Sequence, residues 1–223
     1  MTHALAPALS QGLSGLGLDV DPDKQQQLLV YLDLLSKWNK VYNLTAVRES
    51  QHMLTQHLLD CLAVMSPLRQ RLPQLATVMD VGAGGGLPSV VLAICRPDLR
   101  VTAVDTVAKK AAFIQTAAHA LGLSQLQGVH ARVEDLVGPF DLITSRAFSS
   151  LADFVQGSRQ ALAPGGVWMA MKGKQPAEEL AALPEDVVLE QVQTLQVPGL
   201  DAERCLVWMT LRQVGPCPAP LLR

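Results

Sequence analysis

A glycine-rich loop carries the strongest chemical signal in this sequence. Four glycines fall within five positions of DVGAGGGLPS, residues 80–89, between two apolar runs. Because glycine has no side chain, the backbone N–H groups of such a loop can approach a polar or anionic ligand closely. An acidic residue, Asp80, lies two positions before the first glycine and suits a ligand that carries an ammonium group. The loop therefore predicts a ligand site.

Two classes of cofactor bind to loops of this kind, and the spacing of the glycines separates them. The dinucleotide pattern G-x-G-x-x-G, counted from Gly82 and Gly84, needs a third glycine where this chain has Leu87. The pattern D-x-G-x-G-x-G is complete, with Asp80 in front and Gly86 at its end. It resembles the first motif of S-adenosylmethionine-dependent methyltransferases, whose ligand has an amino acid end and no pyrophosphate.

Two further carboxylates follow in the order that a nucleoside requires. Asp105 ends the next apolar run, 23 residues after Gly82, where a ribose diol would lie. Glu134, in ARVED, follows the third run and would lie near an adenine. Each acid alone can simply cap the next helix, and that alternative stays open. The three acids in register favour S-adenosylmethionine.

The sequence pattern also predicts the strands and helices that place Asp80, Asp105 and Glu134 at one edge of a sheet. We expect strands at residues 76–81, 100–105, 126–131, 140–145 and 167–172, helices at 88–95, 109–121 and 151–162, and a turn at 164–166. Two β-rich runs, near 187–197 and 204–212, predict an antiparallel pair. The fold class is therefore α/β, a Rossmann-like, mostly parallel, doubly wound sheet, in which ligands bind beyond the carboxyl ends of the strands.

A helical extension precedes this pattern. Asp21-Pro22-Asp23 is typical of a helix start, and a second helical stretch runs from about 49 to 65. We therefore divide the chain into a helical extension, residues 1–73, and a methyltransferase domain, residues 74–223. Trp38 lies on an apolar helical stripe and is interpreted as packing, although it can also stack on a base.

Composition limits the class of protein. Hydrophobic residues make up 49% of the 223 residues, but no apolar run approaches the roughly 20 residues of a membrane helix. No signal peptide is apparent, so we expect a cytoplasmic protein. The scattered cysteines, at 61, 95, 205 and 217, predict neither a metal site nor disulfides. Residues 37–174 hold 14 Lys and Arg against 9 Asp and Glu, which fits either a phosphate-rich partner or ordinary surface charge.

Six motifs together resemble the RsmG (GidB) family: KWNKVYNLTAVRE (37–49), HLLDC (57–61), DVGAGGGLPSVVLAI (80–94), ARVED (131–135), SRAF (145–148) and AMKG (170–173). The resemblance implies a class I methyltransferase that uses S-adenosylmethionine to methylate N7 of a guanine in 16S ribosomal RNA. The implied partner is this RNA, in the small ribosomal subunit or an assembly intermediate. We expect a monomer without a metal ion and without a membrane contact.

The resemblance also implies site residues. Cofactor contacts are expected from Asp80, Gly82, Gly84, Leu87, Asp105, Val133, Glu134 and Arg146. Phosphate contacts of RNA are expected from Lys109, Arg132 and Lys172, and also from Lys110 and Lys174, unless these only form a solvated face. This chain has Gly85 and Ser89 where the family commonly has a bulkier residue or proline and a glycine. The change predicts a more flexible loop.

Missing motifs narrow the chemistry. SRAF stands where an exocyclic-amine methyltransferase commonly has D/N-P-P-Y/F, and no cysteine lies in a loop suited to attack on a pyrimidine. A ring nitrogen with its own lone pair needs neither device, so no catalytic base is predicted and His57 is interpreted as structural. We expect Arg146 to position the substrate, or else to form an ion pair with a carboxylate such as Asp141 or Glu134.

The sequence leaves two other functions open. A nicotinamide-dependent oxidoreductase is disfavoured by Leu87 and would bind NAD. A non-catalytic protein that binds RNA or the ribosome through a vestigial pocket would bind the cofactor without transferring a methyl group.

Overall fold

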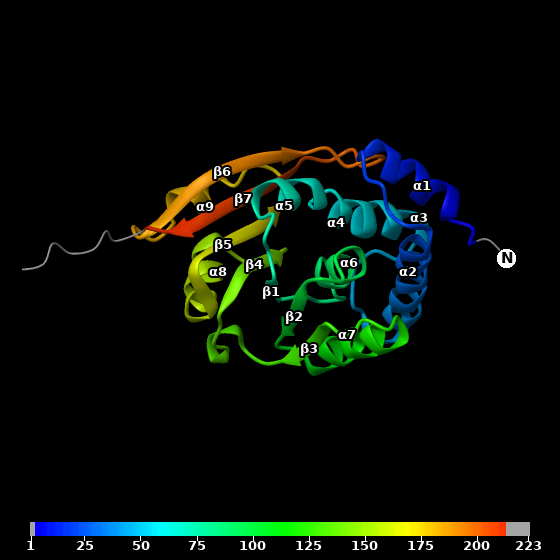
Figure 1. Ribbon diagram of the computed structural model, residues 1–223, viewed down its shortest axis with the longest axis horizontal. Helices are drawn as coiled ribbons and strands as arrows, with labels where there is room; N and C mark the ends of the chain where they lie inside the picture. The colour runs from blue at the N-terminus through cyan, green and yellow to red at the C-terminus, as the bar shows by residue number, and fades with distance from the viewer. Residues whose placement is uncertain (1–2, 213–223) are drawn as a thin grey trace, which may run out of the picture.

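The computed structural model describes residues 3–212, which form one twisted seven-stranded sheet with helices on both faces (Figure 1). The strand order is β3-β2-β1-β4-β5-β7-β6. The strands are β1 Thr77–Val81, β2 Arg100–Asp105, β3 Leu126–His130, β4 Phe140–Arg146, β5 Leu162–Lys172, β6 Val187–Leu195 and β7 Arg204–Leu211. Strands β1 to β5 are parallel, and β7 runs antiparallel to both β5 and β6. The predicted fold class is confirmed.

Two apolar clusters, one on each face, hold the helices to the sheet. The helices are α1 Ala6–Gly15, α2 Pro22–Tyr42, α3 Ser50–Met53, α4 Asp60–Leu62, α5 Met65–Arg71, α6 Ser89–Cys95, α7 Ala108–Ala120, α8 Leu151–Ser158 and α9 Ala177–Ala181. One cluster joins α6, α7 and the N-terminal helices to one face, and the other packs α8 against the opposite face. Figure 1 shows α2 and α7 at one side and α8 at the other.

Helix α2 begins where the sequence predicts it. The side chain of Asp21 accepts a hydrogen bond of 2.9 Å from the backbone N–H of Asp23, which satisfies one of the free donors of the first turn. Near its other end, the ring of Trp38 lies 5.5 Å from that of Phe113 in α7, which confirms the packing interpretation. Helix α5 ends at Arg71 and β1 begins at Thr77, and one apolar core runs across this boundary, so the division of the chain at residue 73 stays a prediction.

The second N-terminal helical stretch is less regular than expected. It contains a π-helical turn, Leu54–Leu59, between α3 and α4, and a further helix, α5, follows. The expected turn at 164–166 lies within an irregular start of β5, where the pairing with β4 shifts and Gly165 has a φ of +77°. A glycine tolerates this conformation, so the chain bends there without leaving the sheet.

Within residues 3–212, no helix is long and apolar enough to cross a membrane. The same residues contain no group of three or more His, Cys, Asp or Glu side chains that could hold a metal ion. The thiols of Cys61, Cys95 and Cys205 are free, and Cys217 lies outside the described residues. Short 3-10 helices follow β3, at Val133–Asp135, and α8, at Arg159–Ala161.

Candidate active site

A cavity of about 480 Å³ opens at the carboxyl ends of β1 and β2 and beside the chain that follows β3. A hollow of about 550 Å³ lies at the opposite edge of the sheet, at the start of β5. In a doubly wound sheet ligands bind beyond the carboxyl ends, which favours the first cavity. It is lined by Val81, Gly82, Val104, Asp105, Thr106, Val107, Lys110, Ala131, Arg132, Val133, Glu134 and Phe148.

The glycine loop is tied to β2 by its own backbone. The N–H groups of Gly82 and Ala83 both donate to the carbonyl of Val104, at 2.9 and 3.0 Å. Gly82, Gly84 and Gly86 have φ values of +70°, +57° and +85°, a left-handed conformation that side chains disfavour. A Cβ on Gly82 would lie 3.6 Å from the ring of Phe148, within the wall of the cavity. The glycines therefore give the loop its shape and leave room at the cavity.

Asp80 lies beneath the loop and does not line the cavity. Its carboxylate is fully buried, and Oδ2 accepts a hydrogen bond of 3.1 Å from the N–H of Ser89, the first residue of α6. Oδ1 has no hydrogen-bond partner among the described residues. Burial raises the pKa of Asp80 from 3.8 to about 6, because the low-dielectric interior disfavours the charged form. Its direct contact with a cofactor stays a prediction.

Asp105 combines loop support with access to the cavity. Oδ2 accepts from the N–H of Gly84 at 2.9 Å, and Oδ1 accepts from the N–H of Val107, just before α7, at 2.9 Å. The Nζ of Lys110 lies 3.7 Å from Oδ2. Each carboxylate oxygen can accept more than one hydrogen bond, so Asp105 can hold the loop and still receive a ligand hydroxyl. The helix-capping alternative and the ligand role are thus compatible.

Helix α2 closes the loop from the other side. The buried hydroxyl of Tyr31 donates to the carbonyl oxygen of Gly85 at 2.5 Å. A Cβ on Gly85 would lie 2.8 Å from Cδ1 of Leu35, so the close approach of α2 favours glycine here. The N–H of Ser89 is held by Asp80. Both positions are thus held by contacts that the sequence does not display, and the expectation of a more flexible loop at Gly85 and Ser89 stays a prediction.

The remaining wall of the cavity comes from the 3-10 turn after β3. Val133 is buried, whereas Glu134 is exposed with Arg132 3.5 Å from its carboxylate. A hydrogen bond from its own backbone N–H is the main cause that lowers the pKa of Glu134, and Arg132 adds to it. Lys109 is exposed on α7, next to Lys110. The rim of the cavity therefore carries both acidic and basic side chains.

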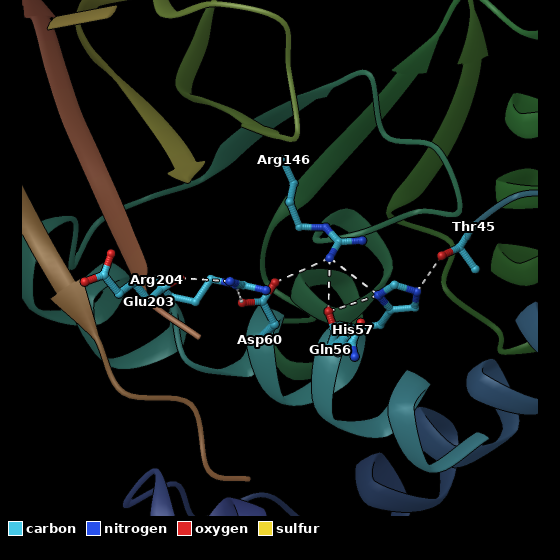
Figure 2. Close-up of polar contacts among 7 residues, drawn as sticks. All are labelled: Thr45, Gln56, His57, Asp60, Arg146, Glu203 and Arg204. Carbon is cyan, nitrogen blue, oxygen red and sulfur yellow. Dashed lines mark hydrogen bonds and ion pairs between the residues drawn. The ribbon is translucent and has the colours of Figure 1, made fainter. Parts of the chain in front are cut away.

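Arg146, the last residue of β4, does not line this cavity, and its side chain extends toward Gln56, His57 and Asp60 (Figure 2). Its Nη1 lies 3.4 Å from Oδ2 of Asp60 and 3.2 Å from the carbonyl oxygen of Gln56. The ion pair expected as an alternative therefore exists, but its partner is Asp60. Asp141 lies at the opposite end of β4, where it accepts hydrogen bonds from Ala76 and Thr77.

His57 lies between Arg146 and the loop that follows α2. Its Nε2 is 2.7 Å from the hydroxyl of Thr45, and its Nδ1 is 3.5 Å from Nη1 of Arg146. Burial, aided by the charge of Arg146, lowers the pKa of His57 to about 4. The ring is therefore neutral near pH 7, in agreement with a structural hydrogen bond.

The structure brings together some of the predicted site residues and separates others. The cavity is lined by Gly82, Asp105, Val133, Glu134 and Arg132. Asp80, Gly84, Leu87 and Arg146 do not line it.

Lys172 is largely buried and pairs with Glu179 at 2.7 Å. Sequence reasoning did not select Tyr31 or Asp60. A charged residue inside the apolar run of HLLDC was the available signal for Asp60.

Comparison with known proteins agrees with this geometry. A family model described as rRNA small subunit methyltransferase G, GidB, matches residues 24–207. The chain belongs to this family. A ribosomal RNA small subunit methyltransferase G from Acidovorax sp. (strain JS42) is 60% identical over 211 residues, covering 91% of this chain and 93% of the relative. Its counterpart from Polaromonas sp. (strain JS666) is 61% identical over 212 residues, covering 93% and 94%.

Solved structures show the same fold at low sequence identity. A SAM-dependent methyltransferase from Aquifex aeolicus aligns with a TM-score of 0.55 and 17% identity, over 81% of this chain and 98% of that one. The N-methyltransferase NodS from Bradyrhizobium japonicum, in complex with S-adenosyl-L-homocysteine, aligns with a TM-score of 0.56 and 13% identity, over 80% and 100%. The fold of this member of the rRNA small subunit methyltransferase G family is thus that of class I methyltransferases.

Proposed function

We propose that the protein transfers the methyl group of S-adenosylmethionine to N7 of a guanine in 16S ribosomal RNA, guanine 527 in the family's nucleotide numbering. The substrate would be the small ribosomal subunit or an assembly intermediate, and the enzyme would act as a cytoplasmic monomer. The observation that carries the proposal is the glycine loop at the carboxyl end of β1, fixed by Asp105 at the mouth of a 480 Å³ cavity.

The residues of the cavity fit this cofactor. Asp105 has acceptor capacity for ribose hydroxyls, and the buried Val133 offers an apolar surface for a purine ring. The left-handed backbone at Gly82 keeps side chains out of the space beside Phe148. Asp80 supplies negative charge beneath the loop, which favours a ligand with an ammonium and a sulfonium group.

Methyl transfer to N7 requires little acid–base catalysis by the protein. When bound, S-adenosylmethionine supplies an electrophilic methyl group on a sulfonium. N7 of guanine has a free lone pair and carries no proton, so no base needs to act before attack. The neutral His57 and the partly exposed Arg146 then serve to hold groups in place, and the protein contributes chiefly by alignment and exclusion of water.

Binding of RNA phosphates fits the basic rim. Arg132 has 73% of its side chain exposed beside the cavity, and Lys109 is exposed on the neighbouring helix. Lys172 is paired with Glu179, so a phosphate would have to compete with that carboxylate. Affinity for RNA should fall steeply with salt, because each phosphate contact releases counterions.

Calorimetry against S-adenosylmethionine and NAD tests the cofactor. We expect binding of the first alone. Gly82→Val should abolish it while the protein still folds, because the side chain would enter the cavity, and the left-handed φ of +70° should lower the melting temperature. Tight binding of NAD alone would contradict the proposal. Mass mapping of ribosomal RNA methylation, with and without the protein, tests the substrate. Cofactor binding without transfer to any small-subunit RNA would instead support a non-catalytic binding protein.

A further inference from the structure

Asp60 forms a buried junction between three distant parts of the chain. It is the first residue of α4, and its side chain is 3% exposed. One oxygen, Oδ2, faces Nη1 of Arg146 at the end of β4, and the other, Oδ1, accepts from Nε of Arg204 at the start of β7 at 3.0 Å. We call Asp60, Arg146 and Arg204 the carboxylate junction. Figure 2 shows the carboxylate between the two guanidinium groups.

A carboxylate buried in this way is stable only if its partners stay in place. Transfer of an unpaired charge from water into a protein costs several kcal/mol, so removal of one partner is strongly unfavourable. Two cations face one anion here, and the junction retains one positive charge. Arg146 and Arg204 keep 23% and 25% of their side chains exposed, so this net positive charge can attract an anionic ligand from solvent. The junction is therefore both rigid and electropositive.

Among the described residues, one nitrogen of Arg146 makes all the hydrogen bonds of its side chain. Nη1 faces two acceptors, the carbonyl oxygen of Gln56 and Oδ2 of Asp60, and lies 3.5 Å from Nδ1 of His57, which itself donates to the carbonyl of Gln56 at 3.0 Å (Figure 2). A guanidinium has five N–H donors in a planar fork. Among residues 3–212, the hydrogen bonds of Arg146 engage neither Nε nor Nη2. Those donors stay available to an external acceptor.

The backbone around the junction is unusual on both sides. Gln56 and His57 lie in the π-helical turn that directly precedes Asp60, and π-helical turns occur frequently at functional sites. Ala147, directly after Arg146, has a φ of +61°, a left-handed conformation that a non-glycine residue seldom adopts. Such conformations persist where the surroundings hold them, and they cluster at functional sites. The π-helical turn contacts the side chain of Arg146, and the left-handed residue follows Arg146 in the chain.

We propose that Asp60 is a positioning residue for methyl transfer. Asp60 fixes Nη1 of Arg146, and the outward Nε and Nη2 then hold an acceptor oxygen of the target nucleotide, either guanine O6 or a phosphate. Arg204 satisfies the other oxygen of Asp60 and ties the junction to the C-terminal strand pair. This inference rests on the proposed function, since it assigns how the RNA is held.

Single-turnover methyl transfer to small-subunit RNA tests the proposal with matched variants. Asp60→Asn keeps the shape and removes the charge, so Arg146 loses its anchor, and we expect a loss in kcat on the order of 100-fold from misplacement. Its affinity for S-adenosylmethionine should change by less than about threefold, since Asp60 does not line the cofactor cavity. Asp60→Glu should recover part of the rate. Asp186→Asn is the control, because Asp186 also pairs with an arginine, Arg159, at the opposite edge of the sheet.

Arg204→Gln separates positioning from stability. It removes the other partner of Asp60 and should lower the melting temperature, while kcat falls far less than in Asp60→Asn. The inference would be overturned if Asp60→Asn folded and had the same kcat as the wild type. It would also be overturned if Asp60→Asn and Arg204→Gln lost activity only in proportion to their loss of stability. If Asp60→Asn failed to fold, a kcat in Asp60→Glu equal to that in Arg204→Gln would overturn it as well.

Two further readouts complete the test. Arg146→Gln should reduce the salt slope of RNA binding by about 0.7 to 0.9 if a phosphate is held, and leave it unchanged if the partner is O6. A loss of kcat is expected in either case, and its absence would refute the role of Arg146. A wild-type protein that methylated no small-subunit RNA would refute the proposed function and this inference together, whereas an active wild type with an equally active Asp60→Asn refutes the inference alone.

Discussion

Asp80→Asn should stabilise the unliganded protein above about pH 6, although it alters a residue of the glycine-loop motif. The carboxylate is fully buried, and its Oδ1 has no partner among the described residues. An amide of the same shape carries no charge and can still accept the N–H of Ser89 through its oxygen. The substitution therefore removes a buried charge and can keep its one hydrogen bond.

The magnitude follows from the pKa of Asp80. Burial raises it from 3.8 to about 6, and each pKa unit is about 1.4 kcal/mol, so ionisation costs the folded state about 3 kcal/mol. The folded pKa lies above the unfolded one. The folded state therefore binds the proton more tightly, its stability is highest below about pH 4, and this contribution is lost as the pH rises through 6. The Asp80→Asn variant has no group that ionises at this position, so its stability does not fall with pH in this way.

Urea denaturation from about pH 4 to pH 7.5 measures the effect as a difference between wild type and variant. The stability of Asp80→Asn relative to wild type should rise by about 3 kcal/mol over this range. Asp141→Asn is the control of opposite sign. Desolvation tends to raise the pKa of Asp141, but hydrogen bonds from Thr77 and Ala76 outweigh it and hold the pKa below its usual value. Because that pKa lies below 3.8, Asp141→Asn should differ from wild type by a nearly constant amount between pH 4 and pH 7.5, and its relative stability should change only at lower pH.

A difference between Asp80→Asn and wild type that does not change with pH would refute the reasoning. It would mean that the carboxylate is solvated in the folded protein or pairs with a cation. The same variant should bind S-adenosylmethionine more weakly if the buried charge serves the cofactor. Greater stability together with weaker binding would show that this residue is kept for function at the expense of stability.

Three further predictions concern the loop and the histidine. Gly86→Ala should destabilise the fold by about 2 to 4 kcal/mol in urea denaturation, because its Cβ would lie 2.5 Å from Val90. Gly122→Ala, at a φ of +69° with nothing within 4 Å, should cost only about 1 kcal/mol, and equal losses would exclude a steric contribution. Tyr31→Phe removes the hydroxyl that holds the loop and should weaken S-adenosylmethionine binding about 5- to 10-fold in calorimetry, so an unchanged Kd would show that the loop is held without it. The rate of methyl transfer should be flat from about pH 6 to 9 in wild type and in His57→Gln, because the pKa of His57 is about 4. An ionisation near neutral pH that His57→Gln abolished would instead identify a catalytic base.

The fold and the edge of the sheet that carries the candidate cavity could be predicted from the sequence, because both depend on local patterns. Asp80 and Asp105 each end an apolar run, and parallel strands bring their carboxyl ends to one edge. Glu134 follows the next strand and reaches the same cavity. The spacing of the glycines fixed the type of loop, since left-handed φ values at Gly82 and Gly84 need that residue.

Contacts between distant segments could not be predicted in this way. The partner of Arg146 is 86 residues away in sequence, and a π-helical turn directly precedes that partner. Helical periodicity does not distinguish such a turn from an ordinary one. The contact at Gly85 could not be predicted for the same reason, since the group that binds its carbonyl, the hydroxyl of Tyr31, comes from a helix 54 residues earlier.

Two carboxylates, Asp60 and Asp80, are buried to nearly the same degree but have different surroundings. Asp60 has an arginine at each oxygen, while Asp80 has one backbone N–H at Oδ2 and no partner at Oδ1 among the described residues. A doubly paired carboxylate resists movement, since displacement would leave a buried charge uncompensated, and this suits a group that orients Arg146. A carboxylate with spare acceptor capacity raises the free energy of the empty protein, and a cationic ligand would relieve that cost on binding. If the proposed roles are right, Asp80 gains a partner only when the cofactor binds, whereas Asp60 already holds Arg146 in position before RNA binds.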